Sequence, residues 1–381
     1  MKAIELFAGI GGFRLACDAK GIHTIFANDI KPTACSVYVD KFGESELRIG
    51  DLSEYMSEIP QHDLLTGGFP CQPFSSAGKK RGIRDPRGTL FEKIVDVLTR
   101  CRPEYFVLEN VKRLLSMENG EHFATILDKL SILGYCIEWR LLNAMDFGLP
   151  QNRQRIFITG IRIAGAPQYV RLVRKTELEE LPNEVLFKIR NYSSWASISD
   201  HGKAFPNWGL AYQGRFSGAS INNFAEKMPS VLLKDVLQDE VPPEFDFTDA
   251  TKTRMDQSKV IQKYVQGVEI ISNQEGGARM GYTIFGTNGV APTLTASSSR
   301  HYERYRIGNK YRRLTNVEYA RIQGFPDDHC RAATVYTQYE LIGNAVPPQM
   351  ASWVIGRLLN DGIAVPDHNT TKQMEIFEYA E

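Results

Sequence analysis

The sequence predicts an α/β fold in which a parallel sheet carries helices on both faces. Two observations lead to this class. Short apolar segments alternate with amphipathic segments from residue 2 to residue 162, and this order is typical of β–α–β crossover units. In addition, polar residues or glycines follow the ends of four strands, which is where such a sheet binds its ligand.

The first half of the chain supplies these strands and helices. Each predicted strand is a short apolar run, and three of the four predicted helices end at a glycine. The strands are expected at 2–7, 23–29, 62–68, 105–110 and 155–162. The helices are expected at 13–21, 32–42, 89–100 and 121–134.

The pattern changes between about residues 165 and 305. The alternation ends there, and glycine, asparagine, serine and aromatic residues become frequent. We therefore expect a second region of irregular or β-rich structure. Compact, patterned sequence returns at 312–328 and 341–359.

The composition is that of an ordinary globular protein. Of 381 residues 43% are hydrophobic, and 45 basic residues balance 45 acidic ones, so the formal net charge is zero. Such a balance leaves room for a local basic groove. We expect no membrane span and no signal peptide. The six cysteines include no CxxC pair, which argues against a metal site and favours a reducing cytoplasm.

A glycine turn and two acids follow the first strands. The turn "FAGIGG" (7–12) lets a ligand approach the backbone at a helix N-terminus, although its spacing is not that of a dinucleotide fingerprint. Asp29 ends the second strand and is suited either to binding ribose hydroxyls or to capping the next helix. Asp51 is suited either to an adenine amino group or to capping a turn.

Three further candidates follow later strands. Cys71 lies between prolines in "GGFPCQPFSSAG", where a stiff loop would present its sulfur, and the alternative is a small buried hydrophobe. Glu109 is suited either to a salt bridge with an arginine or to acid chemistry. In "QNRQR", Arg153 and Arg155 share one face and form either a bidentate binding site or a surface basic pair.

These segments together resemble the cytosine-C5 DNA methyltransferases, most closely the bacterial enzymes of restriction–modification systems. The similarity spans the chain and is weakest between about residues 165 and 305. The matching blocks, in order, are "FAGIGGFRLA" (7–16), "NDI" (28–30), "GDL" (50–52), "GGFPCQPFSSAG" (67–78), "RGTLF" (87–91), "LENV" (108–111), "QNRQRIF" (151–157), "RRLTNVEYARIQGFPD" (312–327) and "GNAVPPQM" (343–350).

The resemblance implies a catalytic chemistry for these residues. Cys71 would add to C6 of a cytosine swung out of the duplex, which raises the electron density at C5. Glu109 would hold N3 and its proton, while Arg155, with Arg153 beside it, would hold the O2 side of the base and orient Glu109. No metal is implied.

The resemblance also implies a cofactor, S-adenosyl-L-methionine, in a Rossmann-like sheet. The residues expected around it are Phe7, Gly9, Gly11, Asp29, Ile30, Asp51, Leu52, Pro70, Leu90, Asn344, Ala345 and Val346. Because three of these lie near the end of the sequence, we expect residues 338–381 to pack on the N-terminal part.

For the partner, the resemblance implies double-stranded DNA. The expected catalytic domain comprises residues 1–230 and 338–381, with 165–230 as an insertion, and the target-recognition domain comprises residues 231–337. Thr293 and Leu294 would anchor the recognition region, and Arg279 is suited to reading a base. The family further implies a monomer in the bacterial cytoplasm, associated with the nucleoid through DNA, and a cognate restriction endonuclease that acts on the same site without direct contact.

Three other classes of protein differ from this family in their sequence signatures. A tRNA cytosine methyltransferase of the same fold would carry a Cys-Phe-Thr tripeptide in the middle region, and the sequence has none there. A binding protein that has lost its activity would not need Cys71, Glu109 and Arg155. A nicotinamide-dependent oxidoreductase is disfavoured by the spacing of the glycines.

Overall fold

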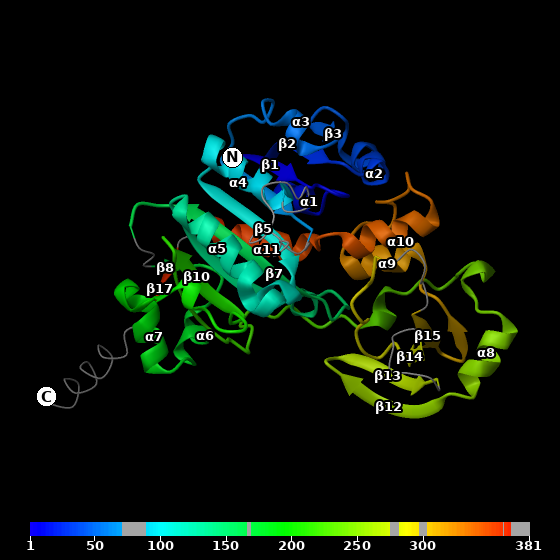
Figure 1. The fold of residues 1–381 in the computed structure, drawn as a ribbon. Coiled ribbons are helices and arrows are strands. Elements are labelled where there is room, and N and C mark those ends of the chain that lie inside the picture. The colour runs from blue at the N-terminus through cyan, green and yellow to red at the C-terminus, as the bar shows by residue number, and fades with distance from the viewer. Residues whose placement is uncertain (71–88, 166–168, 275–281, 297–302, 361, 367–381) are drawn as a thin grey trace, which may run out of the picture.

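The structure, a computed structural model, describes residues 1–70, 89–165, 169–274, 282–296, 303–360 and 362–366. A ten-stranded sheet forms the larger part, in the order β3-β2-β1-β4-β5-β7-β6-β10-β11-β9 (Figure 1). Its strands are β1 (Lys2–Leu6), β2 (His23–Asp29), β3 (Leu47–Ile49), β4 (Leu64–Gly68), β5 (Tyr105–Val111), β6 (Tyr135–Asn143), β7 (Gln154–Arg162), β9 (Ala196–Ser197), β10 (Trp208–Tyr212) and β11 (Arg215–Ala219).

The strands from β3 to β5 are parallel, and the others are not. β5 pairs antiparallel with β7, and β7 pairs antiparallel with β6. The prediction of an all-parallel sheet is therefore wrong beyond β5, and the sequence pattern missed β6. The physical reason is the connection from β6 to β7, in which the only helical element is the short 3-10 turn Ala144–Phe147, so no crossover helix exists to carry the chain back across the sheet.

Helices cover both faces of the sheet, as predicted. Side chains alternate along β5, so that Phe106 and Leu108 join one apolar cluster while Val107 joins the other. The first cluster includes α4 (Thr89–Cys101) and α5 (Glu121–Ile132), and the second includes α1 (Gly12–Asp18) and α11 (Pro348–Leu359). Two further helices lie beside β2 and β3, namely α2 (Pro32–Phe42) and α3 (Leu52–Tyr55).

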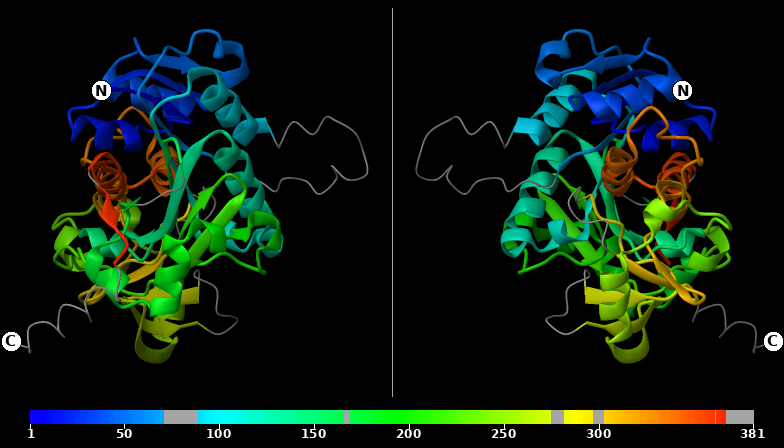
Figure 2. Two further views of the ribbon diagram at one scale, coloured as in Figure 1. Left: turned by 90° about the vertical axis from the view of Figure 1, so that its left-hand side faces the viewer. Right: turned by 90° about the vertical axis from the view of Figure 1, so that its right-hand side faces the viewer.

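The C-terminal part of the chain returns to its beginning. Met350, Val354 and Ile355 of α11 share a buried cluster with Phe13 and Ala16 of α1. Both views of Figure 2 show this red-orange helix beside the blue N-terminal elements. The return therefore brings residues near 345 next to the glycine turn that follows β1.

Residues 169–230 extend the large sheet. β10 pairs with β6, and β11 and β9 continue the sheet beyond it. The added strands and two helices, α6 (Lys175–Glu179) and α7 (Asn183–Arg190), share an apolar cluster centred on Trp195 and Trp208. The segment is thus continuous with the large sheet, and the short pair β8 (Tyr169–Val170) and β17 (Ile363–Ala364) ties it to the C-terminal residues.

A smaller five-stranded sheet stands apart from the large one, with α9 and α10 between them (Figure 1). Its elements are β12 (Lys259–Val265), β13 (Val268–Asn273), β14 (Thr283–Phe285), β15 (Arg304–Ile307) and β16 (Lys310–Arg312), and its neighbours are α8 (Asp249–Asp256), α9 (Asn316–Gln323) and α10 (Val335–Asn344). The prediction of a second, β-rich region is confirmed. In the described part of the chain, no helix is long and apolar enough to cross a membrane.

Candidate active site

A pocket of about 500 Å³ opens at the carboxyl ends of β1, β2, β4 and β5. Residues from the far end of the chain close it, because α10 ends beside the glycine turn. Of the twelve residues expected around the cofactor, eleven line this pocket: Phe7, Gly9, Asp29, Ile30, Asp51, Leu52, Pro70, Leu90, Asn344, Ala345 and Val346. The expectation that ligands bind at the carboxyl ends of the strands therefore leads to one pocket, which both ends of the sequence form together.

Gly11 is the exception, and its role is in packing. Its φ of 82° is a left-handed conformation that favours glycine, and a Cβ there would lie 2.3 Å from Cε2 of Phe42. Its neighbour Gly12 allows an equally close approach, since a Cβ would lie 2.3 Å from the carbonyl oxygen of Val346. These two glycines bring α2 and the C-terminal segment against the turn.

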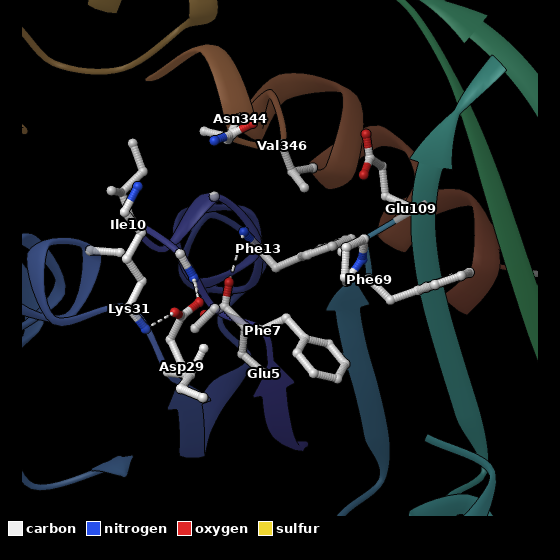
Figure 3. Close-up of a pocket in the computed structure, with 18 of the residues that line it drawn as sticks. Glu5, Phe7, Ile10, Phe13, Asp29, Lys31, Phe69, Glu109, Asn344 and Val346 are labelled. Carbon is white, nitrogen blue, oxygen red and sulfur yellow. Dashed lines mark hydrogen bonds between the residues drawn. The ribbon is translucent and has the colours of Figure 1, made fainter. Parts of the chain in front are cut away.

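Asp29 fixes the glycine turn to the end of β2. Its Oδ2 accepts a hydrogen bond from the N–H of Gly9 at 2.7 Å, and its Oδ1 accepts one from the N–H of Lys31 at 2.8 Å (Figure 3). Lys31, not Asp29, is the N-cap residue of α2. The carboxylate keeps free lone pairs toward the pocket, because each oxygen can accept more than one hydrogen bond.

Asp51 caps a helix and also lines the pocket. Its side chain accepts a hydrogen bond from the N–H of Ser53 at 2.8 Å as the N-cap of α3, and it forms an ion pair with Lys93. The Lys93 ammonium, followed by Ser53, lowers the pKa of Asp51 to about 2. The capping interpretation is confirmed, and a second carboxylate stands at this end of the pocket.

Glu5 also lies in the pocket wall, and the sequence analysis missed it. Its carboxylate accepts a hydrogen bond from the N–H of Phe13 at 3.2 Å (Figure 3) and another from the hydroxyl of Tyr38 at 3.3 Å. Burial raises the pKa of Glu5 to about 8. The signal in the sequence was a carboxylate inside an otherwise apolar strand, "KAIELF".

The other end of the pocket holds a buried ion pair. Nε of Arg155 lies 2.8 Å from Oε1 of Glu109, and both side chains are only 11–12% exposed. Glu109 faces Phe157 across the β5–β7 pair, so Arg155 is its diagonal neighbour on the same face of the sheet. Burial raises the pKa of Glu109, and Arg155 and then Arg153 oppose that shift.

Cys71 and the loop after it lie outside the described residues. The segment that leads into this loop is held in place, because Asn110 donates a hydrogen bond from Nδ2 to the carbonyl oxygen of Phe69 at 2.9 Å. Pro70, the residue before the cysteine, lines the pocket. Asn110 is thus a positioning residue, and its signal was its place beside Glu109 in "LENV".

Arg153 lies behind the pocket and is not among its lining residues. It is 1% exposed, and its guanidinium donates to the carbonyl oxygens of Leu294, Gly343 and Ala345 at 2.8–3.2 Å. These bonds join the large sheet, the region of the small sheet and the C-terminal segment. The arginine therefore holds three parts of the site together.

A buried pair of glutamines extends this junction. Gln151 accepts the N–H of Leu294 at 3.0 Å and donates to Oε1 of Gln323 at 2.7 Å, and Gln323 donates in turn to the carbonyl oxygen of Ala345 at 2.6 Å. The sequence analysis used only the arginines of "QNRQR". The signal that it missed was Gln151, three residues before β7 in the same segment.

The structure describes two of the three residues that were expected in the recognition region. Thr293 donates a hydrogen bond from Oγ1 to the carbonyl oxygen of Asn152 at 2.6 Å, and Leu294 is 1% exposed in the apolar cluster of the small-sheet region. Both residues therefore anchor that region, and the Leu294 side chain offers no surface to a base. Arg279 lies outside the described residues.

The arrangement combines a pocket of about 500 Å³ with a buried ion pair at one end. Among the described residues, no cluster of three histidine, cysteine or carboxylate side chains could hold a metal ion. Such a pocket can bind an adenosine-like group at the Asp29 end and a planar heterocycle against Glu109 and Arg155.

Comparison with known proteins agrees with this geometry. The family model described as C-5 cytosine-specific DNA methylase matches residues 1–360. The chain is 34% identical over 361 residues to the type II methyltransferase M.HaeII of Haemophilus aegyptius, covering 94% of this chain and 93% of the relative. It is 29% identical over 367 residues to the type II methyltransferase M.HhaI of Haemophilus parahaemolyticus, covering 94% and 95%.

Solved structures share the fold. The S. pombe Dnmt2 methyltransferase superposes with a TM-score of 0.59 at 18% identity, covering 94% of this chain and 98% of its own. The DNMT2 mutant of Spodoptera frugiperda gives a TM-score of 0.61 at 19% identity, covering 94% and 99%. The match over nearly the whole chain, together with the site geometry, shows that this protein belongs to the C-5 cytosine-specific DNA methylase family and is similar to restriction–modification methyltransferases.

Proposed function

We propose that this protein is a sequence-specific DNA methyltransferase that moves a methyl group from S-adenosyl-L-methionine to C5 of a flipped-out cytosine through a covalent Cys71 adduct. The observation that carries the proposal is the buried Glu109–Arg155 pair, placed where the pocket meets the segment leading to Cys71. By analogy with its relatives, the modification would protect DNA from a cognate endonuclease that cuts the same site.

The pocket fits the cofactor at its Asp29 end. Ile30 lines the pocket with 65% of its surface exposed, which offers an apolar contact for a purine ring. Asp29 and Asp51 supply carboxylates suited to ribose hydroxyls and an adenine amino group. When bound there, S-adenosyl-L-methionine supplies a methyl group on a positively charged sulfur.

The protein's own groups would then act on the base. The Cys71 thiolate adds to C6 of cytosine, and Glu109 provides the proton that N3 takes up, so that C5 becomes nucleophilic. Arg155 holds the O2 side of the base and fixes the Glu109 carboxyl through the 2.8 Å contact. After C5 gains the methyl group, loss of the C5 proton to a base re-forms the C5–C6 double bond and expels the thiolate, and N3 returns its proton to Glu109.

The proposed partner is duplex DNA, bound by a monomer in the bacterial cytoplasm. Because chemistry on a stacked base requires its extrusion, the enzyme would act on a cytosine outside the helix. Residues 231–337 would read the flanking sequence, since Leu294 of this region accepts a hydrogen bond from Arg153 at the junction behind the pocket.

Bisulfite sequencing of plasmid DNA from cells that express the chain tests the proposal, with Cys71→Ser as the control variant. We expect conversion-resistant cytosines in one short sequence context with the wild type and none with Cys71→Ser. We also expect both proteins to bind S-adenosyl-L-methionine equally in calorimetry. Wild-type protein that binds the cofactor but leaves every cytosine convertible would refute DNA methylation, and full methylation by Cys71→Ser would refute the covalent step.

A further inference from the structure

A second hollow lies next to the active site, on the same edge of the large sheet. It has a volume of about 930 Å³ and is bounded by the turn after β5, by β6 and by residues 204–227. Consecutive residues divide the two cavities: Val111 and Arg155 line the pocket, whereas Lys112 and Gln154 line the hollow. The two sites therefore share one wall.

The hollow also faces the small-sheet region. Met145 lines it, and a Cβ at Gly267, in the turn between β12 and β13, would lie 3.1 Å from Cε of Met145. Beside this contact, Asn152 donates from Nδ2 to Oε1 of Gln266 at 3.1 Å. The lining of the hollow runs from Lys112 to Lys227, and through Met145 the hollow borders the expected target-recognition domain, on the side where the DNA of the proposed function would run.

Its charge favours an anion. Lys112 is exposed and donates to Gln154 at 2.8 Å, a neutral partner that leaves the ammonium charge uncompensated. The Arg113 side chain is exposed, and among the described residues it has no hydrogen-bond or ion-pair partner. Lys227 is 63% exposed and lies 3.8 Å from Asp146, the one carboxylate in the lining.

The fourth cation of the lining is already neutralised. Arg140 forms a buried ion pair with Glu177 and donates to the carbonyl oxygen of Leu172. Three cations therefore face a single carboxylate, among amide side chains such as Asn222. Cations mixed with amide groups are typical of contacts to the sugar–phosphate backbone, which carry no base specificity.

We propose that this hollow binds the sugar–phosphate backbone of DNA beside the flipped cytosine, so that residues 204–227 provide a second DNA contact outside the recognition domain. The proposal rests on the proposed function, and it gives a role to the sheet extension at residues 165–230. Arg113, in the turn after β5, and Lys227, at the end of the segment 204–227, would each meet a phosphate.

The test is the DNA affinity of the charge-reversal variant Arg113→Glu/Lys227→Glu. Fluorescence anisotropy would use duplexes that carry the site mapped by bisulfite sequencing, over a range of salt concentrations. We expect roughly tenfold weaker binding and a slope of log K against log salt that is shallower by about 1.8, as for the loss of two phosphate contacts. The affinity for S-adenosyl-L-methionine should not change.

The matched control is Lys20→Glu/Lys188→Glu. It makes the same charge change at two exposed lysines, one after α1 at the opposite edge of the sheet and one on α7. The control should keep most of the wild-type affinity and slope. If the two double variants bind alike, the proposed contact is overturned and only a general charge effect remains.

Two further measurements keep the result clear. If the charge reversal unfolds the protein, the milder Arg113→Gln/Lys227→Gln should show the same change in slope, and a wild-type slope would overturn the proposal.

Trimming the duplex close to the site on one side should weaken DNA binding by the wild type but not by the variant. Wild-type protein that methylates DNA yet shows no such dependence would refute the hollow alone, whereas wild-type protein that does not bind DNA would refute the proposed function as well.

Discussion

The two ends of the pocket are built differently. At the end formed by the glycine turn, Asp29, Asp51 and Glu5 are each held by two or more separate hydrogen bonds, many of them from backbone N–H groups. At the other end, Glu109 is held by one ion pair with Arg155. Several hydrogen bonds therefore hold the carboxylates at the first end, whereas a single ion pair holds the carboxylate at the second.

This difference predicts how each end responds to substitution. Removing one partner of a buried ion pair leaves an uncompensated charge, which typically costs about 3–5 kcal/mol. Removing one of several hydrogen bonds costs about 0.5–1.5 kcal/mol, or up to about 3 kcal/mol where the group is charged. We therefore expect abrupt loss at the Glu109 end and graded loss at the Asp29 end.

The largest effect is expected for Glu109→Gln. The amide cannot supply a proton to N3 and leaves Arg155 without its counter-charge. Acid–base contributions are typically 10²–10⁴-fold, so kcat should fall by about that factor while cofactor affinity stays within about twofold. Single-turnover methylation and calorimetry would measure the two quantities.

A matched control for this variant is Glu58→Gln. Glu58 makes an ion pair with Arg48 at the same 2.8 Å distance, but its side chain is 48% exposed and lies outside the pocket lining. Its loss should leave kcat unchanged, because exposed pairs contribute little. If Glu109→Gln behaved like Glu58→Gln, the contrast between the two ends of the pocket would fail.

The sequence could predict the parts of the site that follow local patterns. Strand–helix alternation located β1, β2, β4 and β5, and the residues that end these strands line the pocket as expected. The glycine turn and the terminal "GNAV" segment meet there because α11 packs on α1. Pattern and resemblance were sufficient for this half because most of its pocket residues stand at strand ends or at the ends of helices.

What the sequence could not predict depends on contacts between distant segments. The sequence pattern predicted no element at Tyr135–Asn143, and the strand identity of β6 comes from pairing with β7 and β10. Arg153 looked like a partner of Arg155, yet its hydrogen bonds go to carbonyl groups about 140–190 residues away. Nothing in the spacing of "QNRQR" distinguishes a side chain that faces the pocket from one that faces the junction behind it.

An intermediate effect is expected for Asp29→Ala. The change removes the acceptor for Gly9 and Lys31 and the proposed ribose contact, so the cofactor KM should rise roughly tenfold or more with little change in kcat. Asp29→Asn retains one carbonyl oxygen and should fall between the wild type and Asp29→Ala. Steady-state methylation at varied S-adenosyl-L-methionine concentration measures this series, and an unchanged KM in both variants would remove Asp29 from the cofactor site.

The smallest effect on stability and on cofactor KM is expected for Asp51→Asn. This variant tests whether the cofactor end of the pocket tolerates the loss of one contact among several. Asparagine caps a helix about as well as aspartate, so the hydrogen bond from Ser53 should survive, and only the ion pair with Lys93 is lost. Because the Asp51 side chain is 42% exposed, that loss should cost about 0.2–1 kcal/mol.

The pH dependence of folding stability distinguishes the contribution of the Asp51–Lys93 ion pair from that of the Asp51 helix cap. The pKa of Asp51 is lowered to about 2 in the folded state, so its carboxylate stabilises the fold at neutral pH and loses that contribution as the pH falls from about 4 toward 2. Asp51→Asn should remove this part of the acid sensitivity while changing the cofactor KM by only about threefold, which corresponds to less than 1 kcal/mol. Thermal melts across this pH range and cofactor titrations at neutral pH would test both expectations. A KM increase as large as that of Asp29→Ala would mean that Asp51 is a dominant contact, and binding at this end of the pocket would then depend on single residues just as the Glu109 end does.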